Sequence, residues 1–131
     1  MSVKRIEALI DAISSLNGIH NPESEAYQMR NPLLIGSFAR PGKHEMDKKD
    51  RRVFNSLLSG YKAGLYDLDL KLRGFSRVGL KPTDPLTSLL AVYGLTEKLG
   101  IDKVVQFLKR ALKDPTISSK TSLSYFIEEE K

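Results

Sequence analysis

Two short segments of this 131-residue chain place a glycine, an aromatic ring and cations within a few positions of one another. A protein that binds single-stranded nucleic acid needs cations for the phosphates and aromatic faces on which bases stack. The two segments therefore predict loops that bind a single strand, although each ring could equally be a hydrophobic plug that anchors its loop. The predicted binding residues of the first segment are Phe38, Arg40 and Lys43, and those of the second are Arg73, Phe75 and Arg77.

The densest run of positive charge lies just after the first segment, in the sequence Asp47–Arg52. Positions 48, 51 and 52 would share one face of a helix, where like charges repel, so that a bound polyanion would relieve the repulsion. The alternative is a solvated turn whose charge Asp47 and Asp50 partly compensate. The remaining predicted nucleic-acid-binding residues are Lys48, Lys49, Arg51 and Arg52 in this run, with Arg30 and Lys81 on either side of it.

The charge is unevenly distributed along the chain. The net charge is +5, the stretch from 26 to 81 holds 12 basic against 5 acidic residues, and the chain ends in Glu128–Lys131, which sums to −2. A basic excess attracts polyanions and speeds their encounter. The acidic end could compete with nucleic acid for a basic groove, or dock a polymerase or another protein, unless it is a frayed helix end. The neighbouring Tyr125, Phe126 and Ile127 predict a homo-oligomer.

Several function classes are excluded or disfavoured. The chain has no cysteine, which excludes disulfides, thiolate nucleophiles and cysteine-based zinc sites. His20 and His44 lack the spacing of a metal-binding pair, and no phosphate-binding loop or nucleophile elbow is present. We therefore expect a non-enzymatic protein without cofactor or metal. The start of the chain has no apolar signal segment and no run of about 18 apolar residues follows, so we expect a cytoplasmic protein, in the host cytoplasm if viral, with no membrane partner.

The stretch Asp47–Lys81 also carries the longest helical pattern, around which we expect the chain to be organised. Apolar residues at intervals of three and four predict one buried stripe on a helix that begins after Ser56 and ends at Gly74. Gly60 and Gly64 lie one turn apart inside it, and their helix-propensity cost of roughly 1 kcal/mol each indicates the close approach of another backbone. The predicted stripe is Leu57, Leu58, Tyr61, Leu65, Leu68 and Leu72.

The other patterns are also helical. We expect a first helix up to Leu16 that Asn17-Gly18 ends, a short helix from an Asn21 N-cap to Met29, and a helix from Asp84-Pro85 to Gly94. We further expect a turn over Thr96–Leu99 that Gly100 breaks, and a helix that Asp102 caps. The predicted fold is mainly α: one compact domain of about five to six helices over residues 1–121, with a long irregular loop near 32–46 and a C-terminal tail over 122–131.

The order of several motifs points to a known family. The order is Asn17-Gly18, then Ser24-x-Ala26-Tyr27-x-x-Arg30-Asn31-Pro32, then Val53-Phe54-x-Ser56 leading to Gly60-Tyr61-x-Ala63, and later a helix that ends at Tyr93. This order resembles the small lysozyme-like murein-cleaving domains of phage particles and phage-related proteins.

The chain departs from that family at its chemistry. The family's catalytic acid would fall at Asn17, and an amide cannot protonate a leaving group. The loop reads Asn31-Pro32-Leu33-Leu34 instead of Asn-Pro-Gly-Asn. The resemblance thus implies a catalytically degenerate scaffold with no catalytic residue. The carboxylates of Glu23, Glu25 and Glu45 could substitute, or could simply be solvated.

A second resemblance concerns layout alone. Size, basic middle and acidic end resemble the small early single-stranded-DNA-binding transcription regulators of enquatro-type phages, which coat single strands and help to recruit a viral RNA polymerase. We therefore predict a sequence-tolerant nucleic-acid-binding protein of phage origin, with single-stranded DNA preferred and RNA as a further ligand. The alternatives are a lysozyme-like phage domain that cleaves or binds peptidoglycan, and a phage protein–protein interaction module.

Overall fold

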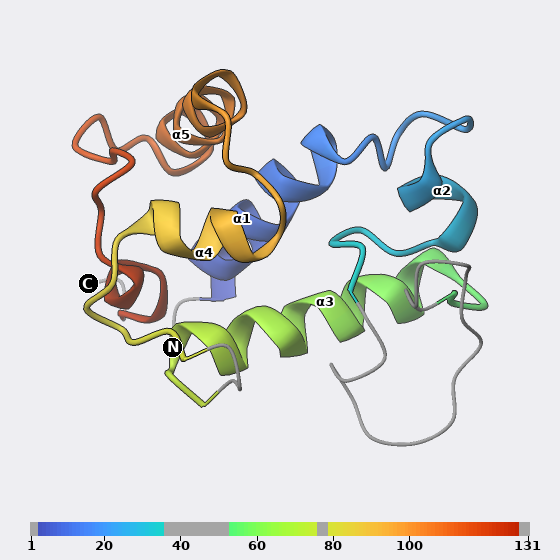
Figure 1. Cartoon of the computed structure of the whole chain (residues 1–131), viewed down its shortest axis with the longest axis horizontal. Helices are drawn as coiled ribbons and strands as arrows, with labels where there is room; N and C mark the ends of the chain where they lie inside the picture. The colour runs from blue at the N-terminus through green and yellow to red at the C-terminus, as the bar shows by residue number, and fades with distance from the viewer. Residues whose placement is uncertain (1–2, 36–52, 76–78, 129–131) are drawn as a thin grey trace.

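The computed structural model describes residues 3–35, 53–75 and 79–128, and the regular structure in these ranges is helical (Figure 1). They contain no strand, only an isolated antiparallel bridge between Pro85 and Ser122. The prediction of a mainly α fold is confirmed. The helices are α1 (Val3–Leu16), α2 (Glu25–Met29), α3 (Leu57–Leu72), α4 (Leu86–Val92), α5 (Lys98–Leu112) and the 3-10 helix η2 (Leu123–Ile127).

Helix α1 lies at the centre of the packing. It contacts α5, α3 and η2, and Figure 1 shows it passing between α3 on one side and α5 on the other. The side chains of Leu9, Ile10 and Ile13 are completely buried. Ile13 follows Leu9 by four residues and Ile10 by three, so the three side chains lie on one face of the helix. The core is therefore organised around α1 and not, as expected from the sequence, around the stretch from 47 to 81.

Helix α3 begins and ends where the sequence predicts, but buries a different face. Ser56 caps it by accepting a hydrogen bond from the Ser59 N–H at 3.1 Å. Leu57 and Leu58 are 50% and 63% exposed, so the predicted stripe is wrong in the first turn. The face toward the core passes instead through the two glycines, because the Arg30 backbone and the Ile10 side chain occupy the space beside them. The buried residues are Gly60, Gly64, Asp67, Leu68, Lys71 and Leu72.

The helix ends are predicted better than the helix starts. Gly18, Gly74 and Gly94 follow α1, α3 and α4 with φ of +83°, +81° and +82°, the left-handed conformation that glycine adopts most easily. Helix α2, by contrast, starts after Ser24, whose hydroxyl accepts from the Tyr27 N–H at 3.1 Å. Asn21 is not its cap, because the Asn21 side chain closes a local turn by accepting from the Glu23 N–H at 3.1 Å.

Helix α5 starts earlier than predicted. It runs without a break through Gly100 and Asp102, and the Ile101 N–H donates to the Glu97 carbonyl at 3.0 Å to close its first turn. Neither a break at Gly100 nor a cap at Asp102 exists. A glycine costs a helix only about 1 kcal/mol, and burial of Val104 and Leu108 on the same helix outweighs that cost.

The described part of the predicted C-terminal tail packs into the core. Leu123 and Phe126 of η2 are completely buried. The Leu123 N–H donates to the Asp84 carbonyl at 2.9 Å and the Ser124 N–H to the Pro82 carbonyl at 2.8 Å. These two hydrogen bonds join η2 to the segment that leads into α4. Within the described ranges, no helix has the length and apolar character needed to cross a bilayer.

Candidate nucleic-acid interface

The structure describes one third of the predicted nucleic-acid-binding residues: Arg30, Arg73, Phe75 and Lys81. The predictions for the others stand without structural information, because these residues lie outside the described ranges. They are Phe38, Arg40, Lys43, Lys48, Lys49, Arg51, Arg52 and Arg77.

Phe75 is exposed on a fixed piece of backbone. Two hydrogen bonds close the end of α3, from the Phe75 N–H to the Leu70 carbonyl at 2.9 Å and from the Gly74 N–H to the Lys71 carbonyl at 3.2 Å. With Gly74 at a φ of +81°, this is a Schellman motif. The residue after the glycine usually packs against the helix in this motif, yet Phe75 is 75% exposed. The helix cap therefore holds the Phe75 ring out toward solvent.

The chain returns to the same end of α3 at Lys81. A Cβ built on Gly74 would lie 4.0 Å from the Lys81 Cα and 3.3 Å from the Pro82 Cδ. The Lys81 side chain is exposed, while its backbone N–H donates to Asp84 Oδ2 at 2.9 Å. Arg73, Phe75 and Lys81 thus lie together, and we refer to these three residues as the α3 cap site.

The charge at the α3 cap site is partly compensated. Arg73 Nε donates to Asp69 Oδ1 at 2.8 Å, and both side chains are about one third exposed. Arg30 belongs to a different place, because its carbonyl oxygen lies against Gly60 and its Nη1 donates to the Phe54 carbonyl at 3.5 Å. At 1.5 Å per residue, Gly60 and Arg73 are about 20 Å apart along α3. Arg30 therefore lies near the start of α3 and Arg73 at its end.

A buried polar cluster joins α3 to the residue that follows α4. Lys71 Nζ forms an ion pair with Asp67 one turn before it, and the Tyr93 hydroxyl donates to Asp67 Oδ2 at 2.5 Å. Lys71 Nζ also lies 4.8 Å from the centre of the Tyr93 ring. Burial and the Asp67 charge raise the pKa of Tyr93 well above its usual value. The Asp67 and Lys71 side chains are 8% and 6% exposed, so the cluster is not open to a ligand.

A groove that sequence reasoning missed lies between α1 and α5. It has a volume of about 330 Å³, and α1 contributes Ala12 and Leu16 to its lining. From α5 come Lys103, Phe107 and Arg110, spaced at intervals of four and three so that they share one helix face. That spacing is the sequence signal, but the groove becomes visible only when α1 is placed beside it.

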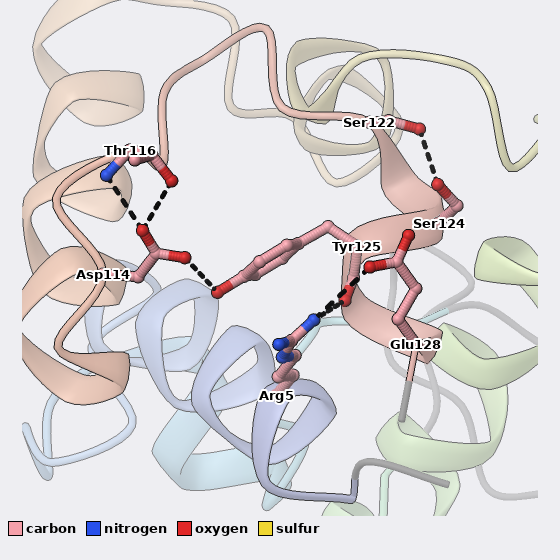
Figure 2. A network of polar contacts seen from close by, with 7 residues as sticks. All are labelled: Arg5, Asp114, Thr116, Ser122, Ser124, Tyr125 and Glu128. Atoms are coloured by element: carbon pink, nitrogen blue, oxygen red, sulfur yellow. Dashed lines mark hydrogen bonds and ion pairs between the residues drawn. The ribbon is translucent and has the colours of Figure 1, made fainter. Parts of the chain in front are cut away.

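Helix η2 and Glu128, the residue that follows it, are held by Arg5 of α1, as Figure 2 shows. Arg5 Nη1 donates to the Tyr125 carbonyl at 2.7 Å, and its guanidinium lies 4.1 Å from the centre of the Tyr125 ring. The same guanidinium is 3.8 Å from Glu128 Oε2. The Tyr125 hydroxyl donates to Asp114 Oδ2 at 2.8 Å. Tyr125 and Glu128, predicted to help dock a partner, are therefore engaged within the chain.

Asp114 anchors the other end of this network. Its Oδ1 accepts from the Thr116 hydroxyl at 2.5 Å and from the Thr116 backbone N–H at 2.9 Å (Figure 2). These bonds, with the one from Tyr125, lower the pKa of Asp114, and the Thr116 hydroxyl has the largest effect. The loop after α5 and the helix η2 are thus joined through one carboxylate.

The residues that carry the lysozyme-like resemblance make structural contacts. The Asn17 side-chain amide donates to the Pro32 carbonyl at 3.0 Å, and Ser24 Oγ donates to the Gly18 carbonyl at 2.5 Å. Asn31 is completely buried and exchanges two hydrogen bonds with the Ile35 backbone, at 3.0 and 3.1 Å. Asn17 therefore holds the loop after α2 at the position where the family's acid would fall.

Further candidate catalytic and metal-binding groups are sparse in the described ranges. Glu23 and Glu25 are exposed, and Glu45 lies outside the described residues. His20 is exposed, and within these ranges no three histidine, aspartate or glutamate side chains gather as a metal site would require. Comparison with protein-family models, with curated proteins and with solved structures found no match to this chain. Both resemblances stay predictions.

Proposed function

We propose that this protein is a non-enzymatic, sequence-tolerant binder of single-stranded nucleic acid, with DNA preferred, and that the α3 cap site stacks one base. The observation that carries the proposal is Phe75, which is 75% exposed although the Schellman hydrogen bonds fix its backbone. Because the backbone of Phe75 is already ordered, stacking of a base on its ring loses little further conformational entropy. Stacking on such a ring tolerates any sequence, because every base has a π-face.

Phosphate contacts would come from cations around that ring. Lys81 is exposed beside Gly74 and fits a phosphate contact as a point charge. Arg73 is shared with Asp69, so its contribution is the smaller. The remaining contacts are assigned to the predicted cations between positions 40 and 52, as the excess of basic residues from 26 to 81 favours. Contact with about 4–6 phosphates gives a log–log salt slope of roughly −3 to −4 on single strands.

The test is a fluorescence-anisotropy titration of a labelled oligothymidylate at several salt concentrations. Phe75→Ala is expected to weaken binding roughly 5- to 150-fold, the range for loss of one stacked base. The matched control is Tyr27→Ala, which removes an aromatic ring that is 47% exposed on α2, away from the α3 cap site. Affinity of this control should equal that of the unaltered protein.

Two results would overturn the proposal. One is a salt-independent affinity, which excludes phosphate contacts as its source. The other is a Phe75→Ala variant that binds as tightly as the Tyr27→Ala control, which removes the base-stacking role. The same titration with duplex DNA and with RNA compares the three ligands, and we expect single-stranded DNA to bind most tightly.

A further inference from the structure

The groove between α1 and α5 combines an apolar floor with charged residues at its edge. Ala12 is 2% exposed, and the half-buried Leu16 and Phe107 complete the apolar lining. Lys103, Arg110 and Asp102 on α5 are exposed and line the same groove. A volume of about 330 Å³ is at the small end of the range of ligand sites.

Neither cation of the groove forms an ion pair within the described part of the chain. Ion pairs are found there for Arg5, Lys71 and Arg73, but none for Lys103 or Arg110. Asp102 is the one carboxylate among the groove residues, so two positive charges face one negative charge. The groove therefore complements a ligand that carries negative charge at one end and an apolar body at the other.

We propose that this groove binds a small alkyl carboxylate, with its chain on Leu16 and Phe107 and its carboxylate against one of the two cations, Lys103 or Arg110. The two cations lie seven residues apart on one face of α5 with Phe107 between them, so that a short chain can reach the floor while its head meets a cation. Apolar contact gives most of the affinity, and the cations select an anionic head over a neutral one. The proposal is independent of single-strand binding at the α3 cap site.

The test compares octanoate with 1-octanol, which share an alkyl chain and differ in charge. Amide chemical shifts of the full chain, followed by NMR during titration with each compound, give both the location and the affinity. Saturable shifts are expected at the groove residues of α1 and α5, with octanoate bound roughly fivefold more tightly than octanol, the size of the effect expected from contacts with exposed cations.

Three variants separate the charges. Lys103→Gln combined with Arg110→Gln should remove the preference for octanoate while octanol still binds, which shows that the groove remains folded. Asp102→Asn should strengthen octanoate binding roughly twofold, because it removes the opposing charge. Lys98→Gln is the matched control: Lys98 is an exposed cation on α5 that does not line the groove, and its loss should change neither affinity.

The proposal is overturned if octanoate gives no saturable shift in the millimolar range, or if its shifts lie outside the groove. Equal affinity for octanoate and octanol would remove the role of the cations. Displacement of octanoate by an equimolar oligothymidylate would assign the groove to nucleic acid and would overturn the carboxylate proposal. This outcome does not depend on whether Phe75→Ala weakens single-strand binding, so the two proposals can fail separately.

Discussion

Gly60 of α3 lies directly against the carbonyl oxygen of Arg30, so closely that a Cβ on Gly60 would be 1.7 Å from that oxygen. Arg30 itself has a φ of +52° as the C-cap of α2, a conformation in which a residue with a side chain is strained. The end of α2 and the first turns of α3 are thus in backbone contact. Glycine is required at this position because every other side chain begins with the atom that would clash.

We therefore predict that Gly60→Ala lowers the free energy of unfolding by at least about 2 kcal/mol, because the helix-propensity gain of up to about 1 kcal/mol cannot offset a backbone clash. Gly64→Ala should cost less, because its nearest neighbour, at 2.8 Å, is the Ile10 Cδ1, the far end of a side chain. Urea denaturation measures each value.

The matched control for these substitutions is Gly100→Ala in α5. A Cβ there would meet only the Leu95 Cδ2, at 4.0 Å, so the alanine should stabilise the protein by up to about 1 kcal/mol. A Gly60→Ala variant as stable as Gly100→Ala would disprove the backbone contact.

The sequence predicts helix ends well because glycine in a left-handed conformation has few substitutes. Gly18, Gly74 and Gly94 each end a helix as expected. Helix starts are less certain, because several polar residues can cap one and tertiary contacts choose among them. Ser24 caps α2 in place of Asn21, and α5 starts at Lys98 well before Asp102.

Burial within α3 could not be predicted from the pattern of apolar residues. Leu57 and Leu58 fit the apolar stripe but are exposed, while the charged residues Asp67 and Lys71, which are not part of that stripe, are buried. Two glycines made room for a neighbouring segment, and that shifted the buried face. The position of the neighbour comes from contacts distant in sequence, which no local pattern contains.

The candidate site was predictable in part. The spacing of Arg73 and Phe75 with Gly74 predicted an aromatic ring in a turn, and Phe75 lies in the turn that ends α3 with its ring exposed. The sequence left open whether the Phe75 ring is buried as an anchor of its loop, because that depends on which other segments pack against the end of α3. The α1–α5 groove was missed altogether, since it needs two helices that lie about ninety positions apart in the chain.

The buried ion pair gives a second prediction. Lys71→Met leaves the Asp67 carboxylate buried with its hydrogen bond from the Tyr93 hydroxyl but without its counterion, and should lower the free energy of unfolding by about 3–5 kcal/mol. Asp67→Leu combined with Lys71→Met removes both charges and should cost less than Lys71→Met alone. Chemical denaturation of the two variants gives the comparison.

The pair formed by Asp69 and Arg73 is the matched control, since it has the same spacing on the same helix but is about one third exposed. Arg73→Gln should therefore cost about 1 kcal/mol or less. Equal costs for Lys71→Met and Arg73→Gln would show that burial of the Asp67–Lys71 pair is not what makes it important.

A third prediction concerns alkaline pH. Burial raises the pKa of Tyr93, and burial together with the bond from the Tyr61 hydroxyl to Asp11 Oδ1, 2.6 Å long, raises the pKa of Tyr61. Above the usual tyrosine pKa near 10 the unfolded chain loses these protons while the folded chain keeps them. Stability should therefore fall as pH rises above about 10, by up to about 1.4 kcal/mol per pH unit for each tyrosine.

Urea denaturation between neutral pH and the alkaline range measures this slope. Tyr93→Phe and Tyr61→Phe should each flatten it, because each variant removes one group that binds its proton more tightly in the folded state. Tyrosinate absorbance provides an independent readout, since ionisation of Tyr93 should accompany unfolding. A slope that neither variant changes would show that other groups control alkaline stability.

The last prediction concerns the anchoring of the C-terminal segment by α1. Arg5→Met removes the bond to the Tyr125 carbonyl, the contact with the Tyr125 ring and the ion pair with Glu128. Hydrogen bonds from charged groups contribute about 1.5–3 kcal/mol, so we expect a loss of about 2 kcal/mol and faster amide exchange over residues 123–127. Lys4→Met, the exposed cation beside it, is the control and should change neither quantity. Because Leu123 and Phe126 are completely buried, loosening this segment also opens the core. If exchange there is unchanged in Arg5→Met, the contacts of Arg5 do not hold η2 in place, and apolar packing alone does so.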